Sequence, residues 1–293
     1  MTFRSSGISL QAQHGGNLSI VTGRTKFALI ILPHHCAFSI VFAILESALF
    51  KKSWFALFLL AAGPVYADNM ELEVYRGEIA DEGESNVDFA ANVMKSPQHG
   101  DWHGASLFQA VGEYSYGLDD SWEIGVKLPL YALNGSWNTE GVLSEIKYVA
   151  PHDMGGLYWG AEIEAGYERM AGENEQWTIE AVPIFGWRNT QWDVAFNPGV
   201  DIASGGDARG KLLFEPAAKV AYRVTGKSAL GLEYFSEAGP VSHVLPGSQR
   251  NELAFVTLDT KVGKSAINVG VGHGANAASP GVALKTVIDI EFD

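Results

Sequence analysis

From Asn86 to the C-terminus, apolar residues recur at every second position, and this spacing constrains the fold more than any other feature of the sequence. A period of two is the period of a β-strand whose two faces meet different surroundings. In one segment, Trp122, Ile124, Val126, Leu128 and Leu130 alternate with Glu123, Gly125, Lys127 and Pro129. No stretch of comparable length shows a helical period of 3.6. The sequence therefore predicts an all-β chain.

Three features favour a transmembrane β-barrel over a soluble β-sandwich. The alternating segments run for about 10–13 residues, which suits a tilted membrane-spanning strand better than the 5–6 residues typical of soluble proteins. Aromatic residues such as Trp122, Trp159, Trp192 and Phe292 lie near segment ends, where interfacial girdles are expected. The connections also alternate between short and long, as in bacterial outer-membrane barrels.

The alternation of connections predicts twelve antiparallel strands, beginning near Glu84 and leaving both termini on the periplasmic side. Long connections are expected near residues 95–104, 133–139, 170–175, 204–210, 239–249 and 275–280. Short turns are expected near residues 117–120, 151–156, 188–190, 225–227 and 263–264. Residues 70–77 (MELEVYRG) alternate as well, and three interpretations stay open: an extension of the first strand, a plug or an edge segment.

Such a sheet must close on itself, because backbone donors and acceptors find no water in hydrocarbon. Twelve strands spaced about 4.8 Å apart and tilted by ~40° give a backbone radius of roughly 12 Å. Inward side chains then leave at most a narrow bore.

The chain divides into four predicted parts: an upstream segment (1–50), a cleavable signal peptide (51–67), a segment of open role (68–83) and the barrel (84–293). Lys51 and Lys52 precede an apolar run (WFALFLLAA), and small residues end at Ala67, so cleavage is expected between Ala67 and Asp68. The apolar run of residues 27–45 contains Pro and His, which makes a poor membrane anchor. We interpret residues 1–50 as the product of a start site assigned too early.

The mature chain is strongly acidic. Removal of residues 1–67 takes five of the 20 basic and one of the 34 acidic residues, which leaves a net charge of about −18. Such a charge argues against nucleic acid as a partner, because phosphates would be repelled. The single cysteine, Cys36, is also removed, so the mature chain has no thiol for catalysis or metal binding.

Residues 113–130 (EYSYGLDDSWEIGVKLPL) form a hairpin that resembles a repeating unit of uncharacterised Gram-negative outer-membrane β-barrel proteins. These are grouped as transporters or with the MetA-pathway phenol-degradation barrels. Residues 145–153, 158–164 and 214–224 are similar in style, so the likeness covers most of residues 70–293. It implies a porin-like protein of the bacterial outer membrane, with membrane lipid, lipopolysaccharide and the barrel-assembly machinery as partners. It implies no particular solute, and the penultimate place of Phe292 departs from the usual terminal aromatic residue.

Placing the apolar faces outward predicts a charged lumen with twelve acidic and four basic residues. The predicted lumen residues are Glu113, Glu123, Lys127, Glu145, Lys147, Glu162, Glu164, Glu180, Asp193, Asp201, Glu215, Lys219, Arg223, Glu233, Asp289 and Glu291. A water-filled lumen of this composition would favour cations. The alternative is a lumen closed by ion pairs, such as Glu123 or Glu145 with Lys127 and Lys147.

Other motifs carry little weight. His99, Asp101 and His103 could meet a transition metal but stand in a Gly-containing loop, so no metal site is predicted. Residues 205–211 (GGDARGK) and 270–274 (GVGHG) imitate nucleotide-binding loops, but a strand rather than a helix is expected after each, and no cofactor is expected.

The favoured function is a passive channel or uptake pore for a small solute. A closed structural or surface-interaction barrel is the alternative, and a hydrolase at the rim, with His243 or His273, comes third.

Overall fold

The computed structural model describes residues 72–95, 106–139, 141–152, 155–168, 176–202 and 210–292, together with the backbone of five strands within residues 3–42. The chain separates into two units, residues 1–60 and 61–293. In the first unit an antiparallel sheet has the strand order β1-β2-β3-β4-β5. Its strands are β1 (Phe3–Ser5), β2 (Ile8–Ala12), β3 (Asn17–Thr22), β4 (Thr25–His34) and β5 (Ala37–Phe42).

The predicted signal peptide, residues 51–67, lies outside the described residues, as do residues 68–71. Cleavage after Ala67 and the early start site therefore stay predictions. Within the described part of the chain, no helix is long and apolar enough to cross a membrane.

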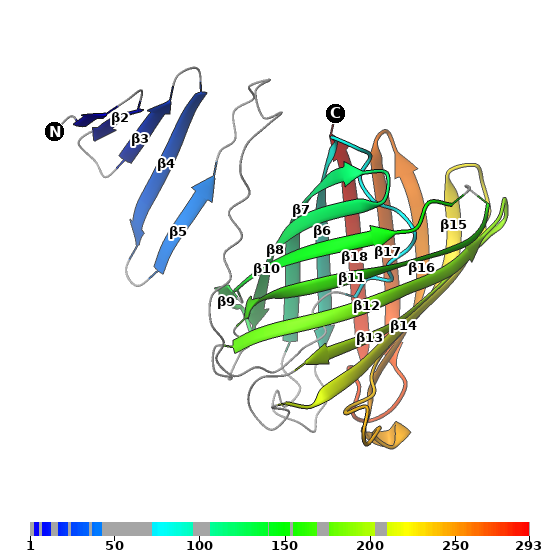
Figure 1. Ribbon diagram of the computed structural model, residues 1–293. Coiled ribbons are helices and arrows are strands. Elements are labelled where there is room, and N and C mark those ends of the chain that lie inside the picture. The colour runs from blue at the N-terminus through cyan, green and yellow to red at the C-terminus, as the bar shows by residue number, and fades with distance from the viewer. Residues whose placement is uncertain are drawn as a thin grey trace. The chain divides into compact units, whose positions relative to one another are not determined.

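The second unit is a closed antiparallel β-barrel (Figure 1). Its strands are β6 (Ser85–Lys95), β7 (Ser106–Asp119), β8 (Trp122–Leu133), β10 (Gly141–Val149), β11 (Gly156–Glu168), β12 (Gln176–Arg188), β13 (Trp192–Ile202), β14 (Leu212–Arg223), β15 (Ser228–Glu237), β16 (Asn251–Val262), β17 (Ser265–Gly274) and β18 (Val282–Phe292). Each strand pairs with its neighbours in the sequence, and β18 pairs with β6 from Ala283↔Met94 to Phe292↔Ser85. The predicted count of twelve strands is confirmed.

A thirteenth short strand, β9 (Ser136–Thr139), pairs only with the far end of β8. From Leu143↔Lys127 onward, strand β10 pairs with β8. Strand β9 is therefore not counted among the strands of the barrel wall. A 3₁₀ turn, η1 (Gly247–Gln249), lies in the connection between β15 and β16.

The strand bounds confirm the predicted alternation of connections. At one end, two residues separate β7 from β8 and two separate β16 from β17; we call this the short-turn end. At the other, ten residues separate β6 from β7 and thirteen separate β15 from β16; this is the long-loop end. Strand β6 begins and β18 finishes at the short-turn end, which the sequence analysis assigns to the periplasm.

The outer surface of the barrel is apolar, as the alternation predicts. Leu128, Trp159, Leu232 and Val256 are 53–63% exposed although they are large hydrophobic residues. Aromatic rings meet across strands at both ends: Trp122 lies 4.8 Å from Tyr148 near the short-turn end, and Phe108 lies 5.1 Å from Trp137 near the long-loop end. A continuous apolar belt between aromatic rims is the surface that a bilayer covers.

The segment before the first strand, residues 72–82, lies inside the barrel. Side chains from strands on different sides of the wall contact it: Asn197 of β13 bonds Tyr75 O, Glu123 of β8 accepts from Ala80 N–H, and Lys285 of β18 donates to Leu72 O. Only a position within the lumen allows all three contacts. Of the three interpretations left open for residues 70–77, the structure supports the plug.

The segment joins the wall at Gly117 of β7, near the short-turn end. Gly83 N–H donates to Gly117 O at 2.9 Å, and Gly117 N–H donates to Glu84 O at 3.1 Å. A Cβ at position 117 would lie 2.2 Å from Asp81 O, so only glycine admits the segment there. The chain then enters β6 without a long linker.

Candidate lumen site

The predicted lumen residues differ in burial. Those most deeply enclosed, each at most 5% exposed, are Glu123, Lys127, Glu145, Glu162, Asp201, Lys219 and Glu233. Those half-buried are Glu113, Lys147, Glu164, Glu180, Asp193, Glu215 and Asp289. Arg223 and Glu291 are exposed, because they stand where their strands finish at the short-turn end.

Lys127 is the centre of the first charged group, the Lys127 cluster. Its Nζ lies 2.8 Å from Glu164 Oε2, 3.0 Å from Glu145 Oε2 and 3.4 Å from Glu162 Oε1, while its side chain is 1% exposed. Glu113 Oε2 is farther away, at 3.9 Å. Three neighbouring strands, β8, β10 and β11, bring these groups together because the relevant residues stand nearly level in the register, as in Glu145↔Glu164.

Lys147 and Glu123 complete the Lys127 cluster. Lys147 Nζ lies 3.8 Å from Glu123 Oε1 and 3.8 Å from Glu162 Oε2. Tyr75 of the lumen segment stands between the two lysines: its hydroxyl accepts from Lys127 at 2.9 Å, and Lys147 lies 5.1 Å from its ring centroid. The segment is thus tied to this cluster by a hydrogen bond and by cation–π attraction.

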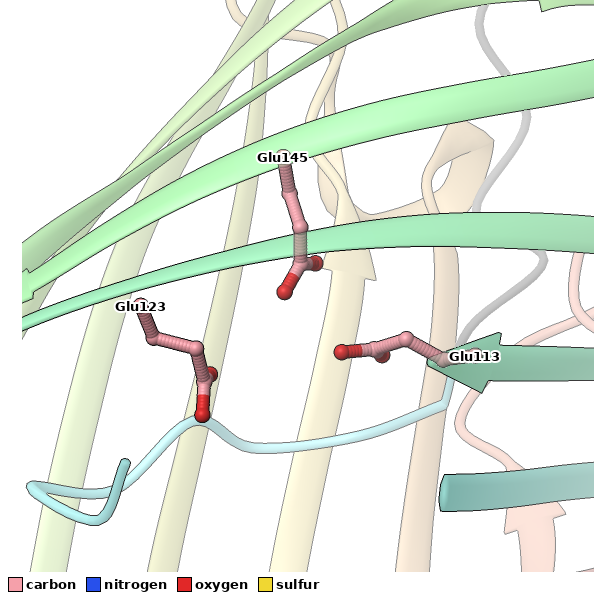
Figure 2. Close-up of side chains that lie close together, drawn as sticks. All are labelled: Glu113, Glu123 and Glu145. Carbon is pink, nitrogen blue, oxygen red and sulfur yellow. The ribbon is translucent and has the colours of Figure 1, made fainter. Parts of the chain in front are cut away.

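Glu113, Glu123 and Glu145 approach one another closely enough to suggest a metal site (Figure 2). Figure 2 shows the three carboxylates converging from neighbouring strands above the coil of the lumen segment. One oxygen of each lies within 4.8 Å of the others. Lys127 and Lys147 already provide positive charge to all three, so we assign them to ion pairs rather than to a metal.

A second group, the Lys285 cluster, lines the β14–β18 side of the lumen. Lys285 pairs with Glu233, whose other oxygen lies 2.8 Å from Lys219 Nζ. Lys219 also lies 2.7 Å from Asp259 Oδ1, and Asn268 donates to both carboxylates. In addition, Lys285 donates to Leu72 O at 2.5 Å, so this cluster holds the deep end of the segment.

Arginines anchor the segment toward the short-turn end. Arg188 lies 2.9 Å from Asp193 Oδ2 and 2.9 Å from Glu78 Oε1. Arg76 lies 3.1 Å from Glu78 and 3.5 Å from Asp193. The hydroxyl of Tyr158 also donates to Asp193 Oδ1 at 3.3 Å. The wall and the segment therefore share one ion-pair network at this level.

An apolar group occupies the lumen alongside Leu72 and Val74. It consists of Leu72, Val74, Met94, Leu107, Tyr131, Ala195, Ala217, Phe235, Leu253, Phe255 and Ala283. Met94, Leu107, Tyr131 and Leu253 stand at the long-loop ends of their strands. The long-loop ends of β6, β7, β8 and β16 therefore present apolar side chains to the lumen, whereas Glu180, Asp201 and Glu215 stand near the long-loop ends of β12, β13 and β14.

Several residues that contact the segment or the lumen clusters are not among those predicted from the sequence. Lys285 lies on a face whose alternation was recognised, and Arg188 follows the period of β12, so alternation alone could have placed both inside. Arg76 and Glu78 could not have been found in this way. Their segment alternates like a strand but is not one.

The histidine motifs gain no support as a reaction centre. His99, Asp101 and His103 lie outside the described residues, as do residues 205–209 of the GGDARGK motif. His243 is exposed in the connection between β15 and β16, and His273 points away from the lumen with its Nδ1 2.6 Å from Gly274 O.

Comparison with solved structures shows that the fold is similar to that of outer-membrane β-barrels. No family model and no curated protein matches the chain. Among solved structures, the COG4313 outer membrane channel from Pseudomonas putida F1 is similar with a TM-score of 0.54 at 12% identity, covering 76% of this chain and 100% of that one. The translocator domain of the autotransporter NalP from Neisseria meningitidis has a TM-score of 0.41 at 9% identity, covering 72% and 88%. The predicted likeness to outer-membrane transporter barrels is confirmed at the level of the fold.

Proposed function

We propose that this chain is a passive outer-membrane channel for a small solute, opened when residues 72–82 leave the lumen. The proposal rests on residues 72–82, which lie in the lumen but form no strand of the barrel wall. Hydrogen bonds and ion pairs, which are reversible contacts, hold them there. Hydrogen bonds to Leu72 O, Tyr75 O and Ala80 N–H, with the ion pairs of Arg76 and Glu78, are the principal anchors.

The location in the outer membrane follows from the same proposal. Export by the signal peptide, insertion by the barrel-assembly machinery and contact with lipopolysaccharide suit a barrel with an apolar belt and aromatic rims. Fold likeness to a protein named an outer membrane channel supports this assignment.

The acidic lumen is part of the proposal. The Lys127 cluster holds five carboxylates and two ammonium groups, so its excess charge is negative. In a narrow passage between low-dielectric walls, this excess would attract cations and repel anions.

A closed structural barrel is the second candidate, and one observation favours it. Lys127 and Lys285, each 1% exposed at the side chain, cross-link neighbouring strands through buried ion pairs on both sides of the lumen. Such networks restrain the lumen whether or not a solute ever passes.

Conductance in planar lipid bilayers separates the two candidates. The test compares the intact protein with a variant in which Gly and Ser replace residues 72–82 one for one. A channel predicts brief, rare openings of the intact protein and a lasting conductance, at least tenfold higher on average, for the variant. If both proteins insert as heat-modifiable barrels and neither conducts, the closed barrel is correct.

A further inference from the structure

Two carboxylates, Glu180 of β12 and Asp201 of β13, face each other on the lumen side of the wall. They are directly paired in the register of these strands. Asp201 is 2% exposed, and Glu180 is half-buried. Among the described residues, neither carboxylate forms an ion pair with a lysine or an arginine. We call Glu180 and Asp201 the acid pair.

The next carboxylate along the same row already has a cation. Glu164 of β11 is paired with Glu180 in the register, but its Oε2 lies 2.8 Å from Lys127 Nζ. Like charges that stand directly opposite each other on neighbouring strands are destabilising. The repulsion within the acid pair is offset by no ion pair from the described part of the chain, so a bound cation would relieve it.

Buried acceptor atoms adjoin the acid pair. Asp201 accepts from Thr178 Oγ1 at 3.0 Å through Oδ1, whereas its buried Oδ2 has no hydrogen-bond partner among the described residues. Asn197 of β13 is 1% exposed and donates to Tyr75 O at 3.0 Å, but its buried Oδ1 likewise accepts nothing from the described residues. Buried polar atoms are nearly always hydrogen-bonded. These two oxygens are therefore suited to a ligand that donates hydrogen bonds.

Gly199 lies between Asn197 and Asp201 on the lumen face of β13 and leaves room for such a ligand. A Cβ added to Gly199 would lie 3.3 Å from Glu180 Oε1 and 2.8 Å from Glu215 O. The carboxylate of Glu180 therefore reaches over the glycine, and a side chain at position 199 would fill the space beside it. The groups that border this part of the lumen from Glu180, Asp201 and Asn197 are acceptors.

Apolar side chains of β12 lie beside these acceptors. The register of β12 and β13 places Val182 opposite Gly199 and Ile184 opposite Asn197. Val182 is 4% exposed and Ile184 is 0% exposed, so both side chains are on the inner face of the wall. Contact with these side chains removes apolar surface of a ligand from water, which is favourable. The site thus combines a charged end with an apolar side.

The donor set favours an ammonium group over a metal ion. An ammonium group brings three hydrogen-bond donors and one positive charge, which carboxylate and amide oxygens satisfy. Within the described residues, the groups of acidic side chains close enough to share one metal ion do not include Glu180 or Asp201. A calcium ion takes about six to eight oxygen ligands, and the apolar side of this site, Val182 and Ile184, supplies none.

We infer that the acid pair binds the ammonium group of a small primary amine, whose hydrocarbon part lies against Val182 and Ile184. This inference rests on the proposed channel function and names its solute class. The segment of residues 72–82 reaches the same place, because Asn197 donates to Tyr75 O. The amine therefore has full access to the site when the segment leaves the lumen.

The test uses n-butylammonium chloride as the probe and the form with Gly and Ser at 72–82 as the starting protein. A bound amine obstructs potassium, so the concentration that halves the potassium current in a planar bilayer measures its affinity. The variant Glu180→Gln with Asp201→Asn removes both charges at nearly unchanged volume. The control Asp88→Asn with Asp289→Asn does the same to another directly paired set of carboxylates, on strands that contain no glycine. The uncharged probe 1-butanol has the same hydrocarbon part.

The site predicts at least a tenfold rise in the half-blocking concentration for the Glu180–Asp201 variant and a change within twofold for the control. It also predicts no block by 1-butanol at the concentrations used for the amine. An equal rise in both variants, or equal block by 1-butanol, would overturn the site.

The starting protein separates failure of the site from failure of the channel. Potassium conductance that n-butylammonium does not block would overturn the site and leave the channel intact. Absence of potassium conductance would overturn the channel and this inference with it. Should the double variant fail to fold, Glu180→Gln alone is expected to raise the half-blocking concentration about threefold, and no change would again reject the site.

Discussion

The two sides of the lumen use the same residue types in different ratios. The Lys127 cluster, on β7–β11, sets two lysines against Glu113, Glu123, Glu145, Glu162 and Glu164. The Lys285 cluster, on β14–β18, sets two lysines against Glu233 and Asp259. One side is acidic and the other is electrically balanced.

The difference separates two roles. The charges of the Lys285 cluster balance one another, and Lys285 also donates to Leu72 O, which holds the segment. The acid-rich Lys127 cluster carries an excess of negative charge, and this charge attracts a passing cation. We therefore expect the β14–β18 side to control how firmly the segment is held, and the β7–β11 side to control which ions pass.

The largest expected effect comes from Lys127→Met in the acidic cluster. Several buried carboxylates would lose the ammonium group that neutralises them, and breaking a buried pair in this way typically costs about 3–5 kcal/mol. The midpoint of thermal unfolding, followed by the heat-dependent shift on SDS gels, should fall by many degrees. Lys147→Met, whose nearest carboxylate oxygens are 3.8 Å away, should have a smaller effect, and equal effects would contradict the central place of Lys127.

Removal of the hydrogen bond from Lys285 to Leu72 O, which we call the latch, should open the channel. Lys285→Met deletes the hydrogen bond to Leu72 O, and a bond from a charged donor is worth about 1.5–3 kcal/mol. The open probability of single channels should rise by about tenfold or more. Lys219→Met disturbs the same cluster without touching Leu72, so an equal rise in that variant would show that the latch is not Lys285.

Selectivity should respond on the acidic side. Glu162→Gln with Glu164→Gln removes two carboxylates at nearly unchanged volume, so the preference for potassium over chloride should fall severalfold. Reversal potentials across a salt gradient measure this preference. Glu233→Gln on the balanced side should change it less, and unchanged selectivity in the first variant would contradict the acidic-lumen proposal.

The smallest effect is expected at the short-turn rim. Arg223 and Glu291 have the alternation of lumen residues but are exposed, so solvent screens their charges. Arg223→Gln and Glu291→Gln should leave unfolding midpoints and reversal potentials unchanged within error. A clear shift in the preference for potassium over chloride would show that the rim, rather than the Lys127 cluster, determines ion selectivity.

Individual residues show what alternation along the sequence can and cannot predict. Glu123, Lys127, Glu162 and Glu233 point inward because a strand sends alternate side chains to opposite faces, and this rule needs no knowledge of the partner strand. Arg223 shows the boundary of the rule. Alternation gives the face of a residue but not its depth, which depends on where the wall ends.

The sequence could not determine the place of residues 72–82. Their alternation is that of a strand, yet β6 already pairs with β18 along its whole length, so the closed wall offers no free edge. The segment lies instead in the lumen, where Leu72 and Val74 meet apolar side chains and Arg76 and Glu78 meet charges.

Sequence alone determined the all-β class, the twelve strands, the apolar outer face and the charged inner one, because each follows from a local period of two and from the lengths of connections. Tertiary structure decided which charges meet, from Lys127 with Glu164 to Lys285 with Leu72 O, 213 positions apart. It also aligned Pro198 with Pro216 in the ladder. Pairing between strands depends on register, and register is settled by the closed barrel as a whole rather than by any one strand.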